Sequence, residues 1–155
     1  MKMKRGLGIA LLLFVAASAI YAVVREYRAD TSTTHLATEK EQGHKVIAYY
    51  FHTTARCMTC RNIEAFTVQA ITAQFGGALE KGNLVWRVLN VEEPTNAHFV
   101  QDYQLSTKSV VIVEMKDGVQ MRWKNLDRVW DEIGTPDQFQ KYIQKELAEF
   151  GGGLL

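Results

Sequence analysis

Two cysteines, Cys57 and Cys60, are the only cysteines of the chain, and two residues separate them. Thiols at this spacing can bind a soft metal ion, form a structural disulfide, or exchange electrons with another thiol protein. Which of these applies depends on the compartment in which the pair is exposed and on the fold that positions it.

Four neighbouring side chains bear on the same chemistry. Arg56 and Arg61 flank the pair, and a nearby positive charge favours the thiolate over the thiol. His52 lies five residues before Cys57 and is expected either to exchange protons near the cysteines or to satisfy a backbone group at a strand end. Met58 and His52 are also the candidate additional ligands if the cysteines bind Cu(I).

The sequence helps to rank the three kinds of site. A closed zinc site needs four ligands, and the chain has no second cysteine pair. A disulfide between Cys57 and Cys60 closes a very short loop, so it removes little entropy from the unfolded chain and is a poor staple. Thiol–disulfide exchange is therefore the favoured interpretation, and a copper site at Cys57, Cys60, Met58 and His52 is the alternative.

The compartment is indicated by the start of the chain. Three positive charges lie in residues 1–5, and the next 19 residues, 6–24, carry no charge. About 20 apolar residues are needed to cross the hydrocarbon core, so residues 6–24 predict a transmembrane anchor with the remainder outside the cytoplasm. The alternative is a cleaved signal sequence, with small residues that allow cleavage after Ala19 or Ala22. Either interpretation predicts export.

Beyond this leader, the chain divides into three parts. Residues 25–44 are polar without apolar periodicity and predict a stalk, residues 45–150 carry the patterns of one domain, and residues 151–155 predict a flexible tail. The chain has 18 Lys and Arg against 17 Asp and Glu, and three of the basic residues lie in the leader. The exported part is therefore nearly neutral, which argues against nucleic acid as a partner.

The first half of the domain predicts two strands around a helix. Residues 45–52 form an apolar and aromatic run typical of a strand buried on both faces. Residues 61–76 carry apolar side chains at three- and four-residue steps, which predicts an amphipathic helix that ends at Gly76 and Gly77. Residues 83–92 predict a second buried strand.

The second half predicts a hairpin followed by a helix. Residues 94–103 can form a short helix opened by a proline, and residues 109–115 predict a third strand. Residues 116–118 (KDG) are a hairpin turn signal, and residues 119–124 alternate like the strand that pairs back. Residues 136–150 predict the last helix, which begins at a proline.

The resulting order, β-α-β-α-β-β-α with a C-x-x-C pair after the first strand, resembles the α/β thioredoxin fold over about residues 44–150. This resemblance implies that Cys57 is the nucleophile and Cys60 the resolving thiol. A cysteine at the first turn of a helix lies near unpaired N–H groups and the positive end of the helix dipole, which favour its thiolate. No bound cofactor is expected, because the electrons come from another thiol protein.

The chain departs from thioredoxins at three positions. Thioredoxins place a cis proline before the third strand, whereas Ser109 or a neighbour stands here, so a trans bond is expected. The buried acid that thioredoxins keep on the first strand is replaced by Phe51 or, with a one-residue gap, by Tyr50. The tryptophan usually found before the first cysteine is replaced by Arg56.

A narrower resemblance rests on two motifs, YYFHTTARCMTCRNIE at residues 49–64 and KNLDRVW at residues 124–130. They are similar to a group of bacterial thioredoxin-like proteins named nitrophenyl-compound nitroreductase subunits. The resemblance implies a small, anchored redox partner of another protein. No flavin- or nucleotide-binding loop is visible in the sequence, so nitro reduction by this chain alone is not expected.

Together these features predict a single-pass protein of the bacterial inner membrane, with a thiol–disulfide oxidoreductase domain on the periplasmic side. Its partner would be a disulfide-bearing or thiol protein, and its location points to a membrane thiol transporter as the source of electrons. The alternatives are a copper carrier and a non-catalytic adaptor. Trp123 and Trp130 are expected to pack in the core, with a docking surface as the alternative.

Overall fold

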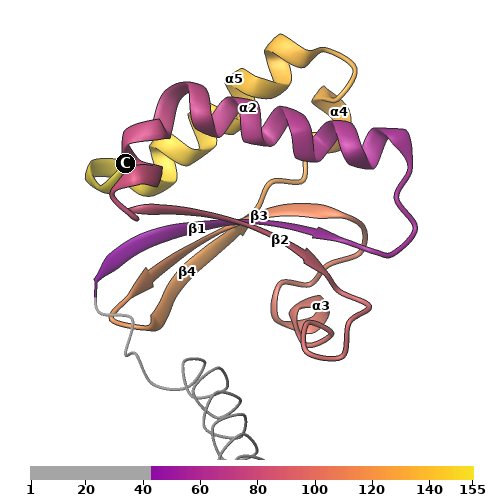
Figure 1. Cartoon of the computed structure of the whole chain (residues 1–155), viewed down its shortest axis with the longest axis horizontal. Coiled ribbons are helices and arrows are strands. Elements are labelled where there is room, and N and C mark those ends of the chain that lie inside the picture. The colour runs from indigo at the N-terminus through magenta and orange to yellow at the C-terminus, as the bar shows by residue number, and fades with distance from the viewer. Residues whose placement is uncertain (1–42) are drawn as a thin grey trace, which may run out of the picture. The chain divides into compact units, whose positions relative to one another are not determined.

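The computed structural model describes residues 43–155 (Figure 1). The predicted leader, residues 1–24, and nearly all of the predicted stalk lie outside these residues. No helix between residues 43 and 155 is long and apolar enough to cross a membrane. In chain order the elements are β1 (His44–His52), α2 (Met58–Glu80), β2 (Leu84–Asn90), α3 (Phe99–Asp102), β3 (Ser109–Lys116), β4 (Val119–Asn125), α4 (Val129–Glu132), α5 (Pro136–Gly151) and the 3-10 turn η1 (Gly152–Leu154).

Four strands form one mixed sheet in the order β2-β1-β3-β4. Strand β1 pairs in parallel with β2 and antiparallel with β3, and β3 pairs antiparallel with β4. The parallel pair is connected by α2, as a parallel connection requires, and β3 and β4 form a hairpin. The element order agrees with the predicted α/β thioredoxin-like fold, for which no strand order was predicted. The short helix α4 was not predicted.

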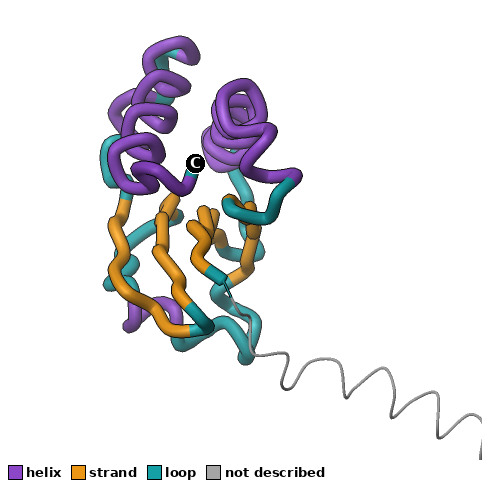
Figure 2. Tube along the Cα trace, turned by 90° about the vertical axis from the view of Figure 1, so that its left-hand side faces the viewer, coloured by secondary structure: helices purple, strands orange, loops and turns teal. Residues whose placement is uncertain are grey.

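Helices cover the two faces of the sheet unequally. Helices α2 and α5 lie side by side on one face, and only the short helix α3 and its flanking loops lie on the other (Figures 1 and 2). Side chains alternate along β1, so Tyr50 packs in the core beneath α2 while Tyr49 and Phe51 pack in the core on the α3 side. The α2 side holds the larger core, which includes Val46, Ala48, Tyr50, Ile63, Ile71, Leu84, Phe139, Ile143 and Leu147.

The prediction of two fully buried strands is confirmed for β1 and wrong for β2. Residues Val46–Phe51 of β1 are all buried, because neighbouring strands flank it on both sides and helices cover both faces. In β2 only Leu84 is buried, because this strand lies at the edge of the sheet and has a partner strand on one side only. An apolar run of strand length therefore did not distinguish a central position from an edge.

Helix α2 does not end at Gly76 and Gly77 as predicted. It continues to Glu80 after a kink at Phe75, whose backbone is non-helical (φ −117°, ψ 22°). A glycine in a helix costs only about 1 kcal/mol relative to alanine, which tertiary packing of the final turn can offset. The helix ends where Gly82 takes a positive φ of 74°, a conformation that glycine adopts without strain.

The hairpin and the last helix agree with the sequence. Asp117 and Gly118 have φ values of 51° and 79° and form a two-residue turn between β3 and β4. Helix α5 has Pro136 in its first turn. The short helix predicted over residues 94–103 is reduced to α3, with turns before it.

The last residues differ from the predicted flexible tail. Gly151 completes α5, and residues 152–154 form η1. The side chains of Leu154 and Leu155 pack against the larger core, and the Asn83 side-chain amide donates a hydrogen bond to the Leu154 carbonyl at 3.1 Å. The structure therefore places this segment against the core through its two leucines.

Trp123 and Trp130 are partly buried and pack against the core, in agreement with the packing role favoured from the sequence. Trp123 packs edge-on against Tyr103, with ring centroids 5.4 Å apart, on the α3 side of the sheet. Trp130 packs against the larger core, and its indole N–H donates a hydrogen bond to the Lys108 carbonyl at 2.9 Å. Trp130 thereby also fixes the loop that leads into β3.

Candidate active site

The two cysteines lie at the N-terminus of α2, which follows β1. Cys57 is the N-cap residue of α2, with an extended backbone (φ −76°, ψ 171°), and its sulfur accepts a hydrogen bond from the Cys60 backbone N–H at 3.2 Å. Cys57 and Cys60 form a disulfide, with Cα atoms 5.1 Å apart. The predicted position of Cys57 at the helix start is therefore confirmed.

The two sulfurs differ sharply in their access to solvent. Cys57 is an exposed residue, whereas Cys60 is fully buried, with 0% of its surface exposed. An incoming sulfur can therefore reach Cys57 but not Cys60. This asymmetry is what a pair with one attacking and one resolving cysteine requires.

Tyr50 of β1 contacts the buried cysteine from the sheet. Its hydroxyl donates a hydrogen bond to the Cys60 carbonyl at 2.8 Å, and the residue is itself completely buried. Burial raises the pKa of the Tyr50 hydroxyl, and the charge of Arg56 partly opposes that rise. From the sequence alone, Tyr50 stands out only as a residue in place of a missing acid, so its contact with Cys60 is a feature that sequence reasoning missed.

Arg56 is not an unpaired charge beside the cysteines. Its guanidinium forms an ion pair with the Glu64 carboxylate, and its Cζ lies 5.9 Å from the centroid of the Tyr50 ring. Both charged side chains are partly buried, with 27% and 28% of their surface exposed. Glu64 was not predicted as a site residue, although its position on α2, one helical turn after Cys60, could have suggested it.

Arg61 and His52 have contrasting surroundings. Arg61 is exposed in the first turn of α2, and within residues 43–155 no ion-pair partner is found for it. The Nδ1 atom of the His52 ring lies 2.9 Å from the Thr53 carbonyl oxygen. Of the two roles expected for His52, the structure therefore supports the backbone contact at the strand end.

The structure offers limited support for the copper alternative. Cys57 and Cys60 are bonded to each other, Met58 is 73% exposed, and His52 is engaged with the Thr53 carbonyl. Across residues 43–155, no three His, Cys, Asp or Glu side chains gather closely enough to hold a metal ion. Within this part of the chain, a copper site would therefore depend on the two sulfurs, reduced, and on Met58.

The loop that connects β1 to Cys57 is hydrogen-bonded to the end of β2 and to the segment after it. The Thr54 backbone N–H donates to a Glu92 carboxylate oxygen at 2.9 Å, and the Asn90 side-chain amide donates to the Thr54 hydroxyl at 3.0 Å. Hydrogen bonds from Thr54 hold the pKa of Glu92 below its usual range, and the Lys108 charge adds to the effect. These contacts set the path of the chain between β1 and Cys57.

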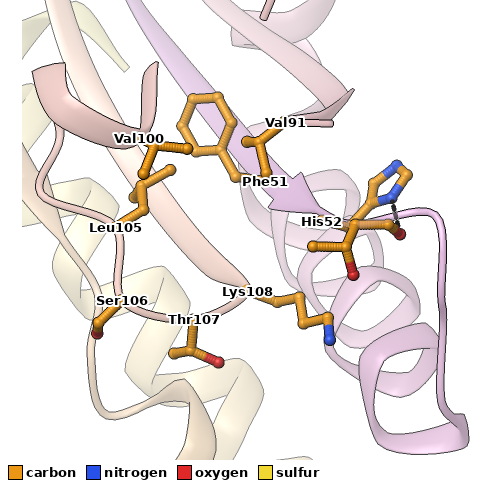
Figure 3. A pocket seen from close by; sticks show the side chains of 9 residues that line it. Phe51, His52, Val91, Val100, Leu105, Ser106, Thr107 and Lys108 are labelled. Carbon is orange, nitrogen blue, oxygen red and sulfur yellow. Dashed lines mark hydrogen bonds between the residues drawn. The ribbon is translucent and has the colours of Figure 1, made fainter. Parts of the chain in front are cut away.

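A pocket of about 310 Å³ opens beside this loop (Figure 3). It lies between the end of β1, the segment after β2, α3 and the loop that precedes β3, and it is lined by Phe51, His52, Thr53, Val91, Val100, Leu105, Ser106, Thr107 and Lys108. Ser109 follows this loop, is buried, and donates a hydrogen bond to the Thr107 carbonyl at 2.9 Å. No peptide bond of the described residues is cis, so the bond before Ser109 is trans as expected.

Comparison with known proteins gives matches only among solved structures. No protein-family model and no curated protein matches the chain. A thioredoxin from Thermus thermophilus is 19% identical over 70% of this chain and 77% of its own, with a TM-score of 0.43. Fasciola hepatica thioredoxin is 20% identical over 68% and 91%, with a TM-score of 0.37. Mitochondrial thioredoxin 3 from Saccharomyces cerevisiae, in its oxidized form, is 15% identical over 68% and 81%, with a TM-score of 0.39.

The fold assignment rests on the strand order and the connections of this chain. The narrower resemblance to nitroreductase subunits is not tested by these comparisons and stays a prediction.

Proposed function

We propose that this protein is a thiol–disulfide oxidoreductase that exchanges two electrons with a partner protein through Cys57 and Cys60. The observation that carries this proposal is the asymmetry of the pair. An exposed cysteine at the N-terminus of α2 is bonded to a buried cysteine one helical turn later.

The exchange takes two balanced steps. In the reduced protein, the Cys57 thiolate attacks one sulfur of a partner disulfide, forms a mixed disulfide and releases one partner thiolate. The Cys60 thiol then loses its proton and attacks the Cys57 sulfur, which releases the second partner thiolate and closes the Cys57–Cys60 disulfide. The reverse sequence oxidises a partner dithiol. The same residues serve both directions.

The surroundings of Cys57 support its role as the attacking group. Its sulfur already accepts the Cys60 N–H, and a thiolate is a stronger acceptor than a disulfide sulfur. The helix N-terminus and the exposed guanidinium of Arg61 add positive potential. Each of these contributions favours the charged form of Cys57.

The direct test is to trap the mixed disulfide in cells that express single-cysteine variants. Cys60→Ser should accumulate adducts through Cys57 that dithiothreitol releases. Cys57→Ser should accumulate few, because the remaining Cys60 is buried. The absence of trapped adducts in both variants would contradict exchange. A variant that lacks both cysteines and stays fully functional would indicate an adaptor. Copper retained at unit stoichiometry by the reduced protein would indicate the carrier.

We further propose that residues 6–24 anchor the protein in the bacterial inner membrane, with the domain on the periplasmic side. The uncharged leader and the positive charges before it support this proposal. Its partner is then a disulfide-bearing or thiol protein outside the cytoplasm, and a membrane thiol transporter is the proposed electron source. The narrower family resemblance adds that the protein is a redox partner of another protein.

Fractionation tests the location. An anchored protein should stay in membranes washed with alkaline carbonate and be digested by protease added to spheroplasts. The mass of the mature protein decides between an anchor and a signal sequence, because cleavage would remove the residues up to Ala19 or Ala22. Protection from protease in spheroplasts would contradict the proposed orientation.

A further inference from the structure

The ion pair between Arg56 and Glu64 takes no part in the exchange steps, yet its two residues flank the cysteines along the chain. Arg56 directly precedes Cys57, and Glu64 lies one helical turn after Cys60 on the same face of α2. The two charged residues therefore lie on either side of the cysteine pair along the chain, Arg56 before Cys57 and Glu64 after Cys60. An ion pair in this place can change the energy of a charged sulfur.

We propose that Glu64 tunes the reduction potential of the Cys57–Cys60 pair by neutralising Arg56, an inference that rests on the proposed oxidoreductase function. An uncompensated cation beside Cys57 would stabilise its thiolate, and with it the reduced protein, and would raise the potential. Glu64 places an equal and opposite charge on the same guanidinium. Because it acts through Arg56 and not on the substrate, Glu64 is a positioning residue.

The setting of the pair makes this effect larger than that of a surface ion pair. Both side chains are more than two-thirds buried, and the guanidinium lies over the ring of the completely buried Tyr50. Partial burial weakens the screening by water and salt that reduces surface pairs to small effects. The charge of Glu64 is therefore screened less from Arg56 than it would be in a surface pair.

Arg61 shows what an unneutralised arginine at this site looks like. It lies in the same first turn of α2, is exposed, and has no ion-pair partner among residues 43–155. The two arginines flanking the cysteines are therefore not equivalent. Arg61 adds a positive charge that only solvent screens, whereas Glu64 neutralises the charge of Arg56. The reduction potential is therefore lower than two unneutralised arginines would give, and the domain is a weaker oxidant.

The potential can be measured without a partner protein. Two molecules of glutathione reduce the Cys57–Cys60 disulfide to Cys57 thiolate and Cys60 thiol, form one glutathione disulfide and release one proton. The equilibrium is read by alkylating free thiols of the purified full-length chain at fixed pH. The variants are Glu64→Gln, Arg56→Met and the double variant. Glu132→Gln is the matched control, because Glu132 pairs with Arg128 and both line a pocket over α5 that includes neither cysteine.

The expected shifts have opposite signs. Glu64→Gln should favour the reduced form about three- to tenfold, a rise of roughly 15 to 30 mV. Arg56→Met leaves Glu64 unpaired and should favour the disulfide by a similar factor, and the double variant should return close to the wild-type value. A structural role alone would not produce opposite shifts that cancel. Glu132→Gln should leave the potential unchanged.

Two outcomes would overturn the inference. One is a Glu64→Gln potential equal to that of Glu132→Gln, and the other is a shift of the same sign in both single variants. Either leaves the proposed function standing if Cys60→Ser still traps partners. If the shifts appear but no partner is trapped, the tuning by Glu64 holds and the proposed function fails.

Discussion

Replacing Tyr50 by Phe removes one oxygen atom and should loosen the anchorage of Cys60. The Tyr50 hydroxyl donates a 2.8 Å hydrogen bond to the Cys60 carbonyl, and the ring is completely buried in the larger core. A neutral buried hydrogen bond contributes about 0.5 to 1.5 kcal/mol net. The carbonyl keeps its helical acceptor role within α2, so it is not left without a partner. We therefore expect a loss of about 1 kcal/mol, near the middle of this range.

Urea unfolding of the oxidised protein at neutral pH measures this loss. The midpoint should fall while the slope of the free energy against urea stays constant, because the surface exposed on unfolding is unchanged. The matched control is Tyr103→Phe, which loses a 2.8 Å hydrogen bond to the Gln120 side chain on the α3 side of the sheet. Both variants should lose stability, and Tyr103→Phe should lose less, because its hydrogen bond is only partly buried and Gln120 is exposed to water.

A second readout separates the two tyrosines. In a Cys57→Ser background, the buried thiol of Cys60 should be alkylated several times faster when Tyr50 is replaced by Phe, because the turn that carries Cys60 is less firmly held against β1. Tyr103→Phe should leave the alkylation rate unchanged. Unchanged stability and unchanged alkylation in Tyr50→Phe would refute the reasoning, because the hydrogen bond would then hold nothing in place.

Three further predictions concern backbone conformation and titration. Gly77→Ala should stabilise the domain by about 0.5 to 1 kcal/mol, because it lies within α2 with no atom within 4 Å of an added Cβ, whereas Gly82→Ala, at φ +74°, should destabilise it by about 1 kcal/mol. A hydrogen bond from Arg122 lowers the pKa of Glu114. The stability that this carboxylate contributes is therefore present above the ordinary carboxyl pKa and is lost as the pH falls through the lowered value. Glu114→Gln should make the acid limb, the fall of stability with falling pH, less steep. Burial raises the pKa of Tyr142 to about 12, so its phenolate absorbance should appear well above pH 10, and the associated stability should be lost as the pH rises through about 12.

Each of these predictions has its own control. Equal effects of alanine at the two glycines, measured by urea unfolding, would show that the end of α2 is not where the structure places it. For Glu114, the comparison is Glu149→Gln on the exposed face of α5, which should leave the acid limb unchanged. For Tyr142, the phenol titrations of the wild-type protein and of Tyr142→Phe are compared. Loss of a phenol that titrates near pH 10, instead of one near pH 12, would contradict the raised pKa.

The sequence predicted the elements that depend on local patterns. The run of apolar residues in β1, the Asp117–Gly118 turn and the proline that opens α5 each constrain the backbone through their own side chains. Their positions agree with the prediction to within two residues. The C-x-x-C pair likewise predicted its own position, because a cysteine that follows a buried strand and precedes an amphipathic helix can only lie at the junction.

The sequence did not predict features that depend on how distant residues meet. The partial burial of β2 follows from its place at the edge of the sheet, which its own residues do not encode. The Arg56–Glu64 pair and the Tyr50–Cys60 hydrogen bond require the loop, β1 and α2 to be placed relative to one another. Leu154 and Leu155 looked like a tail because only the folded chain brings the core within their reach.

The hydrogen bond from the Cys60 N–H to the Cys57 sulfur makes one atom serve as both a redox centre and a helix cap. Helix caps control how readily the first turn of a helix frays. Reduction converts this cap from a weak disulfide-sulfur acceptor into a charged thiolate acceptor. The first turn of α2 should therefore fray less in the reduced protein. Amide hydrogen exchange at Cys60 and Arg61 should slow on reduction. A partner would then contact a helix N-terminus whose local stability differs between the two redox states.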